Sequence, residues 1–291
     1  MHLQNDPMGN PMSQLQPEVE EKTSFLEDLK ETLQRGKTID GYDYKVKKRY
    51  HEPAPSSINS EEFKQIVESR RSVRKFTDKK IPKEVLDACI DMALLAPSSC
   101  NLQPWEFHVV QSTEKKKLLV EACMSQNAAT TAAELIVVVA RTKSWPKIAK
   151  LNIEDWPQDP IPKHWKEFYT KGVQFTYWQG PFYSLGPIKK ALSAVAGLFR
   201  PMPRGPFTKA DMRVWATKSV ALAAENLMLA FRAYGFDSCP MEGMDETRVR
   251  KLLELPKDAE VVMVVGAGER ANDGVYFPRV KFDRKNFVRY V

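Results

Sequence analysis

The chain has 291 residues, a hydrophobic content of 43%, a charged content of 28% and a formal net charge of +7. These values exclude a disordered chain and leave room for one large domain or two small ones. The lysines and arginines alternate with aspartates and glutamates and form no continuous basic stripe. We therefore expect no nucleic-acid partner.

The cysteines form no CxxC pair, and no histidine stands at metal-ligand spacing from them. We therefore expect no metal site and no disulfide framework, which is typical of a cytoplasmic protein with reduced thiols. The sequence shows no signal segment and no apolar run long enough to span a bilayer, so membrane contact is not expected.

Residues 1–60 form an N-terminal extension without a sustained hydrophobic period, apart from a short helix expected over 23–36. Such a segment is partly disordered or wraps the surface of the main body. We expect the folded body to span 61–291 and to begin with a helix that Ser60 caps.

The folded body alternates helical and strand patterns. Helices are expected after Pro82, over 114–124 and over 210–234, the last with a capping box of Thr208 and Asp211, and after a cap at Asp245. Strands are expected over 105–110, 135–140 and 261–265, and the last two are apolar enough to be buried on both faces. Residues 236–245 are expected to form a polar loop.

Residues 141–207 form an insert of different composition. Between residues 141 and 210 lie 12 of the 29 aromatic side chains, and prolines interrupt the backbone repeatedly. This pattern favours either a lid over a bound ligand or a lobe with a small core of its own. An amphipathic helix is expected over 188–199, packed against the body or a partner subunit rather than on a membrane.

Several separated segments carry residues suited to a phosphate-bearing organic cofactor. The run RRSVRKF (70–76) sets three arginines beside a serine, and guanidinium groups bind phosphate through charge-assisted hydrogen bonds. The polar loop APSSCNLQPW (96–105) lies between a helix and a strand, PMEGM stands at 240–244, and a basic segment follows at 278–284. No Ser-His-Asp or Cys-His constellation accompanies them, so we expect the cofactor to supply the chemistry.

In their order and separations, the first three segments resemble the FMN-dependent nitroreductase superfamily, over about 61–140 and 208–291. The resemblance implies an α+β fold: a three-layer sandwich in which helices flank a mixed β-sheet. It also implies a domain-swapped homodimer with FMN at the interface. The helix over 210–234 would be the central dimer helix, and the segment ending at 287–291 would add an edge strand to the partner subunit.

The resemblance also implies which residues bind FMN. Its phosphate and the pyrimidine end of the flavin would be held by Arg70, Arg71, Ser72 and Arg74, with a second basic pair at Arg279 and Lys281. The loop of the other subunit would contribute Pro97, Ser98, Ser99, Asn101 and Gln103. The reactive edge would face Pro240, Met241, Glu242 and Gly243, with the backbone N–H groups of Glu242 and Gly243 near N5 and O4. A further flavin contact would be Asn127, and no catalytic side chain is expected.

The implied activity is hydride transfer from NADH or NADPH to flavin N5, then to a nitroaromatic, quinone or similar electrophilic small molecule, by a ping-pong mechanism. Backbone donors would stabilise the developing charge. One alternative is a reductive dehalogenase of the iodotyrosine deiodinase type, for which the insert offers Glu167, Tyr169 and Lys171, although at a different spacing. Others are a non-enzymatic flavin-binding sensor and, ranked lower, a flavin-dependent dehydrogenase or flavin-cannibalising enzyme of the superfamily.

Overall fold

The structure is a computed structural model that describes residues 52–55, 57–157 and 160–291. The helix expected over 23–36 lies outside these residues. The folded body begins with α2 (Ser60–Ser69), but its N-cap is Asn59 and not Ser60. The Asn59 side chain accepts hydrogen bonds from the N–H groups of Glu61 and Glu62, which satisfies two of the free donors at the helix start.

A four-stranded antiparallel sheet forms the centre of the fold. Its order is β1 (Trp105–Val109), β2 (Glu134–Arg141), β4 (Ala259–Gly268) and β3 (Asp237–Met241). The expected mixed sheet is therefore antiparallel in all four strands. Among the described residues, the one parallel pairing with this sheet is an isolated bridge between Ser72 and Ser238 of β3. It does not extend further, because the residues after Val73 pair instead with 269–274.

The segment expected as a polar loop over 236–245 contains the edge strand β3. Pro240 is tolerated there because an edge strand needs hydrogen bonds on one side only. Asp237, at the start of β3, is only 2% exposed and binds Arg232 at 2.8 Å and Arg270 at 2.6 Å. These two ion pairs tie β3 to the preceding helix and to the segment after β4.

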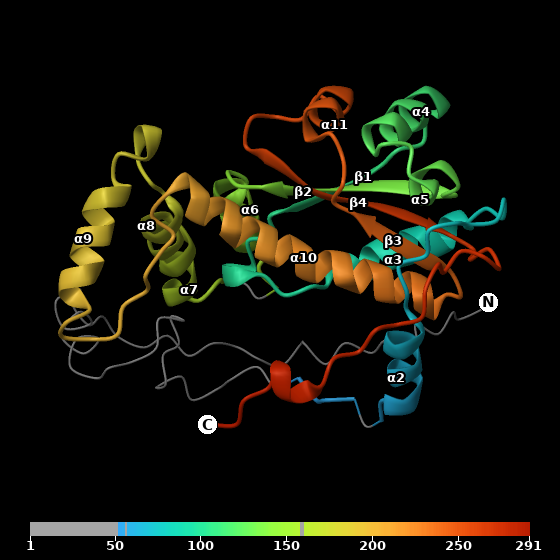
Figure 1. The fold of residues 1–291 in the computed structure, drawn as a ribbon. Helices are drawn as coiled ribbons and strands as arrows, with labels where there is room; N and C mark the ends of the chain where they lie inside the picture. Colours follow the sequence, from blue (N-terminus) through green and yellow to red (C-terminus); the bar gives the residue numbers. More distant parts are fainter. Residues whose placement is uncertain (1–51, 56, 158–159) are drawn as a thin grey trace, which may run out of the picture. The chain divides into compact units, whose positions relative to one another are not determined.

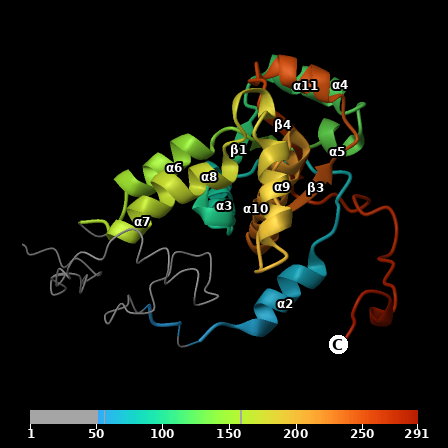
Figure 2. The same ribbon diagram turned by 90° about the vertical axis from the view of Figure 1, so that its left-hand side faces the viewer.

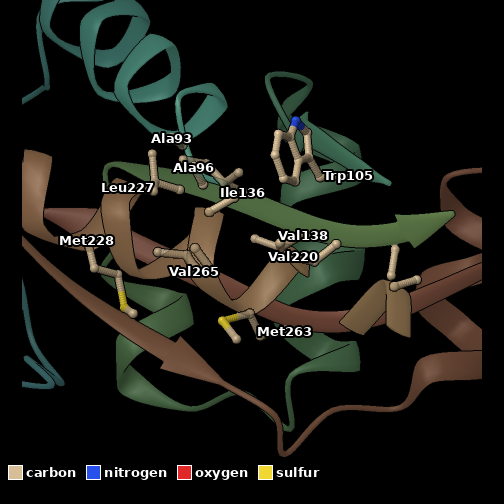
Figure 3. Close-up of a cluster of buried hydrophobic side chains, with 14 of the residues drawn as sticks. Ala93, Ala96, Trp105, Ile136, Val138, Val220, Leu227, Met228, Met263 and Val265 are labelled. Carbon is tan, nitrogen blue, oxygen red and sulfur yellow. The ribbon is translucent and has the colours of Figure 1, made fainter. Parts of the chain in front are cut away.

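Helices cover both faces of the sheet and make three layers (Figure 1). One face carries α3 (Lys83–Leu94) and α10 (Lys209–Ala233). The other carries α4 (Thr113–Ala122), α5 (Asn127–Thr130) and α11 (Glu246–Leu252). Side chains of β2 alternate between the two hydrophobic clusters that result: Ile136 and Val138 belong to the α10 cluster, and Val137 and Val139 to the opposite one. Figure 3 shows the first cluster.

In its described residues, 141–157 and 160–207, the insert contains four short α-helices, namely α6 (Trp145–Glu154), α7 (Lys163–Glu167), α8 (Val173–Tyr177) and α9 (Gly186–Ala196). Part of its aromatic content forms a small core. The Tyr177 ring lies between Trp145, at a centroid distance of 6.2 Å, and Trp215 of α10, at 4.8 Å. The insert is thus a lobe with its own packing, continuous with the main core.

Two expectations about exposed segments have different outcomes. The apolar residues Ile188, Leu192 and Val195 of α9 are exposed, so within one chain this helix does not bury them against the body, and packing against a partner subunit stays a prediction. The C-terminal segment 276–291 forms no strand within the single chain, and its addition to a partner sheet stays a prediction. None of the described helices is long and apolar enough to cross a bilayer.

Helix α10 begins with the capping box that the sequence predicts. Thr208 accepts from the N–H of Asp211 at 3.1 Å, and Asp211 accepts from the N–H groups of Phe207 at 2.8 Å and Thr208 at 2.9 Å. The hydrogen bond from Phe207, together with those from Thr208, lowers the pKa of Asp211, although partial burial opposes the shift.

We predict that Asp211→Asn lowers the free energy of unfolding by about 0.5 to 1 kcal/mol near neutral pH, because it removes a charge at a helix N-terminus. The folded-state pKa of Asp211 lies below its unfolded value, so its stabilisation is present above the unfolded pKa and is lost as the pH falls. Urea unfolding should therefore show a smaller difference between wild type and variant in acid. An equal difference at both pH values would contradict this assignment.

Candidate functional site

The predicted cofactor residues fall into two separate groups. Residues 70–74, 127, 240–243 and 276–279 are connected around β3 and the segment that follows β4. Residues 97–103 instead contact α6 and α8 of the insert. Figure 1 shows the segments after α2 and after β4 passing close to β3.

The arginine-rich run is held in extended form by β3. The N–H of Val73 donates to the carbonyl of Ser238 at 3.1 Å, and the Val73 side chain is fully buried. Burial at this position fixes the run against the sheet. The Ser72 hydroxyl beside it makes no hydrogen bond to any described residue.

The segment after β4 packs on the same run. The N–H of Arg74 donates to the carbonyl of Gly274 at 2.7 Å, and the N–H of Ala271 donates to the carbonyl of Lys75 at 3.1 Å. A Cβ at Gly274 would lie 2.4 Å from the Lys75 oxygen, so this close approach requires glycine. Sequence reasoning did not single out Gly274.

The cations of this group differ in how they are engaged. Arg71 donates to the carbonyl of Phe277 at 2.5 Å and Arg279 to that of Arg70, so both link the two segments. Arg70 also forms an ion pair with Glu225 at 3.7 Å. Lys281 is exposed and makes no ion pair within the described part of the chain.

Arg74 has the greatest spare donor capacity of this group. Its side chain makes one long hydrogen bond, 3.4 Å, to the carbonyl of Ser72, and its guanidinium carbon lies 5.9 Å from the centroid of the Tyr276 ring. The Tyr276 hydroxyl in turn accepts from the Asn127 amide at 2.9 Å. Asn127 thus lies in the group to which the sequence assigned it, two contacts from Arg74.

The end of β3 presents free backbone donors. Pro240 and Met241 belong to the strand itself, which corrects their placement in a loop. The N–H groups of Glu242 and Gly243 just beyond it donate no hydrogen bond to any described residue. Such donors can stabilise negative charge that develops on a bound ligand.

Gln126 is a residue of this site that sequence reasoning missed. Its side-chain amide donates to the carbonyl of Gly243 at 2.8 Å and to that of Cys123 at 3.0 Å. It therefore joins the turn before α5 to the segment after β3. The only signal in the sequence is a polar side chain next to Asn127, which many surface turns share.

Two side chains of β3 bear on what the site can do. Ser238 Oγ is buried beside the arginine-rich run without a hydrogen-bond partner among the described residues. Burial raises the pKa of the Cys239 thiol, and nearby Arg74 only partly offsets that shift. Cys239 is therefore a protonated, buried small side chain at neutral pH.

This donor set suits FMN. Arg74 and the Ser72 hydroxyl offer unused donors for a phosphate, and the Glu242 and Gly243 N–H groups offer donors for an electron-rich ring edge. These residues can therefore bind and orient a cofactor that supplies its own redox chemistry.

The loop over 97–103 is a rigid structure of its own. Ser98 Oγ accepts from the Gln103 N–H at 3.0 Å, and the Asn101 amide donates to Asn152 of α6 at 2.7 Å. Three of its residues, Cys100, Asn101 and Gln103, have positive φ angles, a conformation that such side chains adopt at a cost. The loop is thus held in a defined shape, away from the β3 group within the single chain.

The insert contributes a pocket next to this loop. A cavity of about 650 Å³ lies between the start of α6 and the residues after α8, and its wall includes Trp145, Tyr177 and Phe182. Tyr177 joins pocket and loop, because its hydroxyl lies 2.8 Å from Ser99 Oγ.

The residues considered for an iodotyrosine deiodinase-type clamp do not converge on a ligand. Tyr169 is buried in the core of the insert, where burial raises the pKa of its hydroxyl. Glu167 and Lys171 form an exposed ion pair with each other at 3.6 Å. The structure therefore gives this alternative no support.

The sequence model of the nitroreductase family matches residues 67–269. The chain belongs to this family. The match includes the arginine-rich run, the loop at 97–103, the whole sheet and the free N–H groups beyond β3.

Individual relatives agree with the family assignment. The chain is 28% identical over 229 residues to the Bacillus subtilis protein named NAD(P)H nitroreductase YdgI, covering 78% of this chain and 97% of that protein. It is 26% identical over 223 residues to 4-nitrobenzoate reductase of Pseudomonas putida, covering 73% and 87%. The fold matches a nitroreductase of Exiguobacterium sibiricum solved with FMN, with a TM-score of 0.58, 25% identity and coverage of 79% and 97%.

We predict that Arg74→Gln raises the dissociation constant of FMN about 10- to 100-fold, because a charge-assisted hydrogen bond contributes about 1.5 to 3 kcal/mol. Titration of the flavin-free protein with FMN, followed by flavin fluorescence, measures the change. Lys64→Gln on the exposed side of α2 removes the same charge elsewhere and should leave the constant unaltered. Equal constants for wild type and Arg74→Gln would remove Arg74 from the site.

We also predict that Gln126→Ala slows reduction of bound flavin about 5- to 10-fold, since one hydrogen bond that orients the Gly243 region is lost. Stopped-flow absorbance under anaerobic conditions measures the rate after addition of NADH or NADPH. FMN binding should change little, which separates orientation of the N–H donors from loss of the cofactor. An unchanged reduction rate would show that Gln126 is not needed for this geometry.

Proposed function

We propose that this chain transfers hydride from NADH or NADPH, by way of bound FMN, to a nitroaromatic, quinone or similar electrophilic acceptor. The two half-reactions occur in turn at one site. As a member of the nitroreductase family, the protein is an NAD(P)H-dependent oxidoreductase that uses FMN. The observation that carries the proposal is the pair of free N–H groups at Glu242 and Gly243, next to the arginine-rich run.

The residues of this chain bind, orient and stabilise charge, while FMN supplies the redox chemistry when bound. Arg74, with the Ser72 hydroxyl, holds the phosphate. Arg71 and Arg279 each donate to a backbone carbonyl and so join the arginine-rich run to the segment after β4. The Glu242 and Gly243 N–H groups stabilise negative charge at the reactive edge. No side-chain nucleophile is required, which agrees with the protonated state of Cys239.

The proposed active form is a homodimer in which the loop over 97–103 of one subunit completes the site of the other. Two observations support this arrangement. Within one chain that loop lies apart from the β3 group, although it is rigid and polar. Large apolar side chains are also exposed on three helices, which would be available to a second subunit. They are Phe63 and Val67 of α2, Leu94 of α3, and Val214 and Leu222 of α10.

The name of one relative bears on the acceptor. The 26% identical Pseudomonas putida protein is a 4-nitrobenzoate reductase, so a nitroaromatic compound is a suitable first acceptor for assay. The aromatic wall of the pocket in the insert, with Trp145 and Phe182, offers flat surfaces for such a ring.

A cytoplasmic location remains a prediction.

The deciding experiment is an absorption spectrum of the purified protein before and after anaerobic addition of NADH or NADPH. We expect a flavin spectrum that bleaches with one or both donors and returns when 4-nitrobenzoate or a benzoquinone is added. Flavin that stays oxidised would favour the sensor hypothesis. A protein that takes up no FMN would overturn the proposal altogether.

A further inference from the structure

Helix α9 exposes a continuous apolar face. Ile188, Leu192 and Val195 recur at the spacing of one helix face, and each has more than half of its surface exposed. Phe199, in the turn just after the helix ends at Ala196, is 84% exposed. An amphipathic helix normally buries its apolar face against the protein or a partner. Nothing in the described chain covers it. Figure 2 shows α9 in front of α10, toward the viewer.

The opposite face of α9 is fixed to the chain by small residues. A Cβ at Gly186 would lie 2.0 Å from the carbonyl oxygen of Phe207, and Ser193 Oγ donates to the carbonyl of Pro203 at 2.7 Å. At Gly197 a Cβ would lie 2.0 Å from the Arg204 guanidinium. The backbone of 203–207 therefore occupies the small-residue side, and the helix cannot rotate to bury its apolar side there.

Helix α9 is also tied to α8. The Lys189 ammonium group donates to the carbonyls of Thr176 at 2.9 Å and Trp178 at 3.1 Å, and burial lowers its pKa. The same ammonium group lies 5.4 Å from the centroid of the Phe175 ring. Phe175 and Trp178 are themselves more than half exposed, so the apolar surface extends from α9 toward α8.

This region carries a net positive charge. The insert, 141–207, contains eleven Lys and Arg and four Asp and Glu, a net charge of +7 that equals the net charge of the whole chain. Within 168–210 there are six cations and no acidic residue: Lys171, Lys189, Lys190, Arg200, Arg204 and Lys209. Over 168–210, the segment that contains the exposed apolar face, cations therefore do not alternate with acidic residues.

We propose that α9 is an interfacial helix that binds the surface of an anionic lipid bilayer. Its apolar face would enter the boundary between headgroups and acyl chains, while Lys190, Arg200 and their neighbours meet lipid phosphates. The combination of exposed large apolar side chains with a segment, 168–210, that holds six cations and no acidic residue matches this partner in both chemistry and charge. It differs from the sequence-based expectation that the protein has no membrane contact.

A second copy of the chain is a poorer occupant of this face. In a two-fold symmetric interface the same surface meets itself, so the cations of 168–210 would face one another. Like charges at an interface oppose association, whereas an anionic surface neutralises them. The helices proposed for the homodimer, α2, α3 and α10, are separate from α9.

Co-sedimentation of the FMN-saturated protein with lipid vesicles tests the proposal. We expect binding to vesicles of phosphatidylcholine with phosphatidylglycerol, little binding to phosphatidylcholine alone, and weaker binding as salt is raised. Leu192→Glu should weaken binding about tenfold or more, because an apolar contact with the bilayer becomes a charge. Lys190→Gln with Arg200→Gln should weaken it about 5-fold per cation.

Matched controls make these outcomes specific. Leu118→Glu on α4 introduces the same charge at another exposed leucine, and it should leave vesicle binding unchanged. Flavin absorbance and circular dichroism establish that each variant is folded. Because the readout is vesicle binding, it does not depend on the acceptor or the activity.

Three results would overturn the proposal. The first is no binding to anionic vesicles, and the second is equal binding to both vesicle types. The third is a larger assembly for the wild type than for Leu192→Glu in lipid-free light scattering, with no vesicle binding by either. That result would assign the apolar face of α9 to a second copy of the chain.

Discussion

The buried carboxylate of Asp237 is the interaction on which the position of the site depends. It accepts from Arg232 at the end of α10 and from Arg270 just after β4, and it begins the edge strand β3. A carboxylate that is 2% exposed is stable there only with such partners, because removing it from water costs several kcal/mol. The same strand then positions Ser238 beside the arginine-rich run and ends at the free N–H groups.

The predicted site residues form two separate groups within one chain, and this division is the reason for proposing a homodimer. The β3 group has donors for the phosphate and for the reactive edge of FMN. The loop over 97–103 has polar groups held in strained backbone, but they lie against α6 and α8. Strain of this kind persists where the surrounding packing fixes it, and the Asn152 and Tyr177 contacts do so.

The insert combines two roles that the sequence could not separate. Its inner aromatic residues, such as Tyr177, extend the main core and line a pocket, whereas α9 carries its apolar residues outward. The difference arises from the small residues Gly186 and Ser193, which let the backbone of 203–207 approach the other side of the helix.

The sequence by itself determined the elements with strong local signals. It predicted the capping box of α10, the buried strand β2 and the three segments that identify the family, because these depend on near neighbours and periodicity. Tertiary structure alone decided that 237–241 is a strand, since its pairing partners lie far away in the chain and Pro240 disguises it. It also decided that Gln126 orients Gly243 and that α9 faces outward, because both depend on which distant backbone occupies the adjacent space.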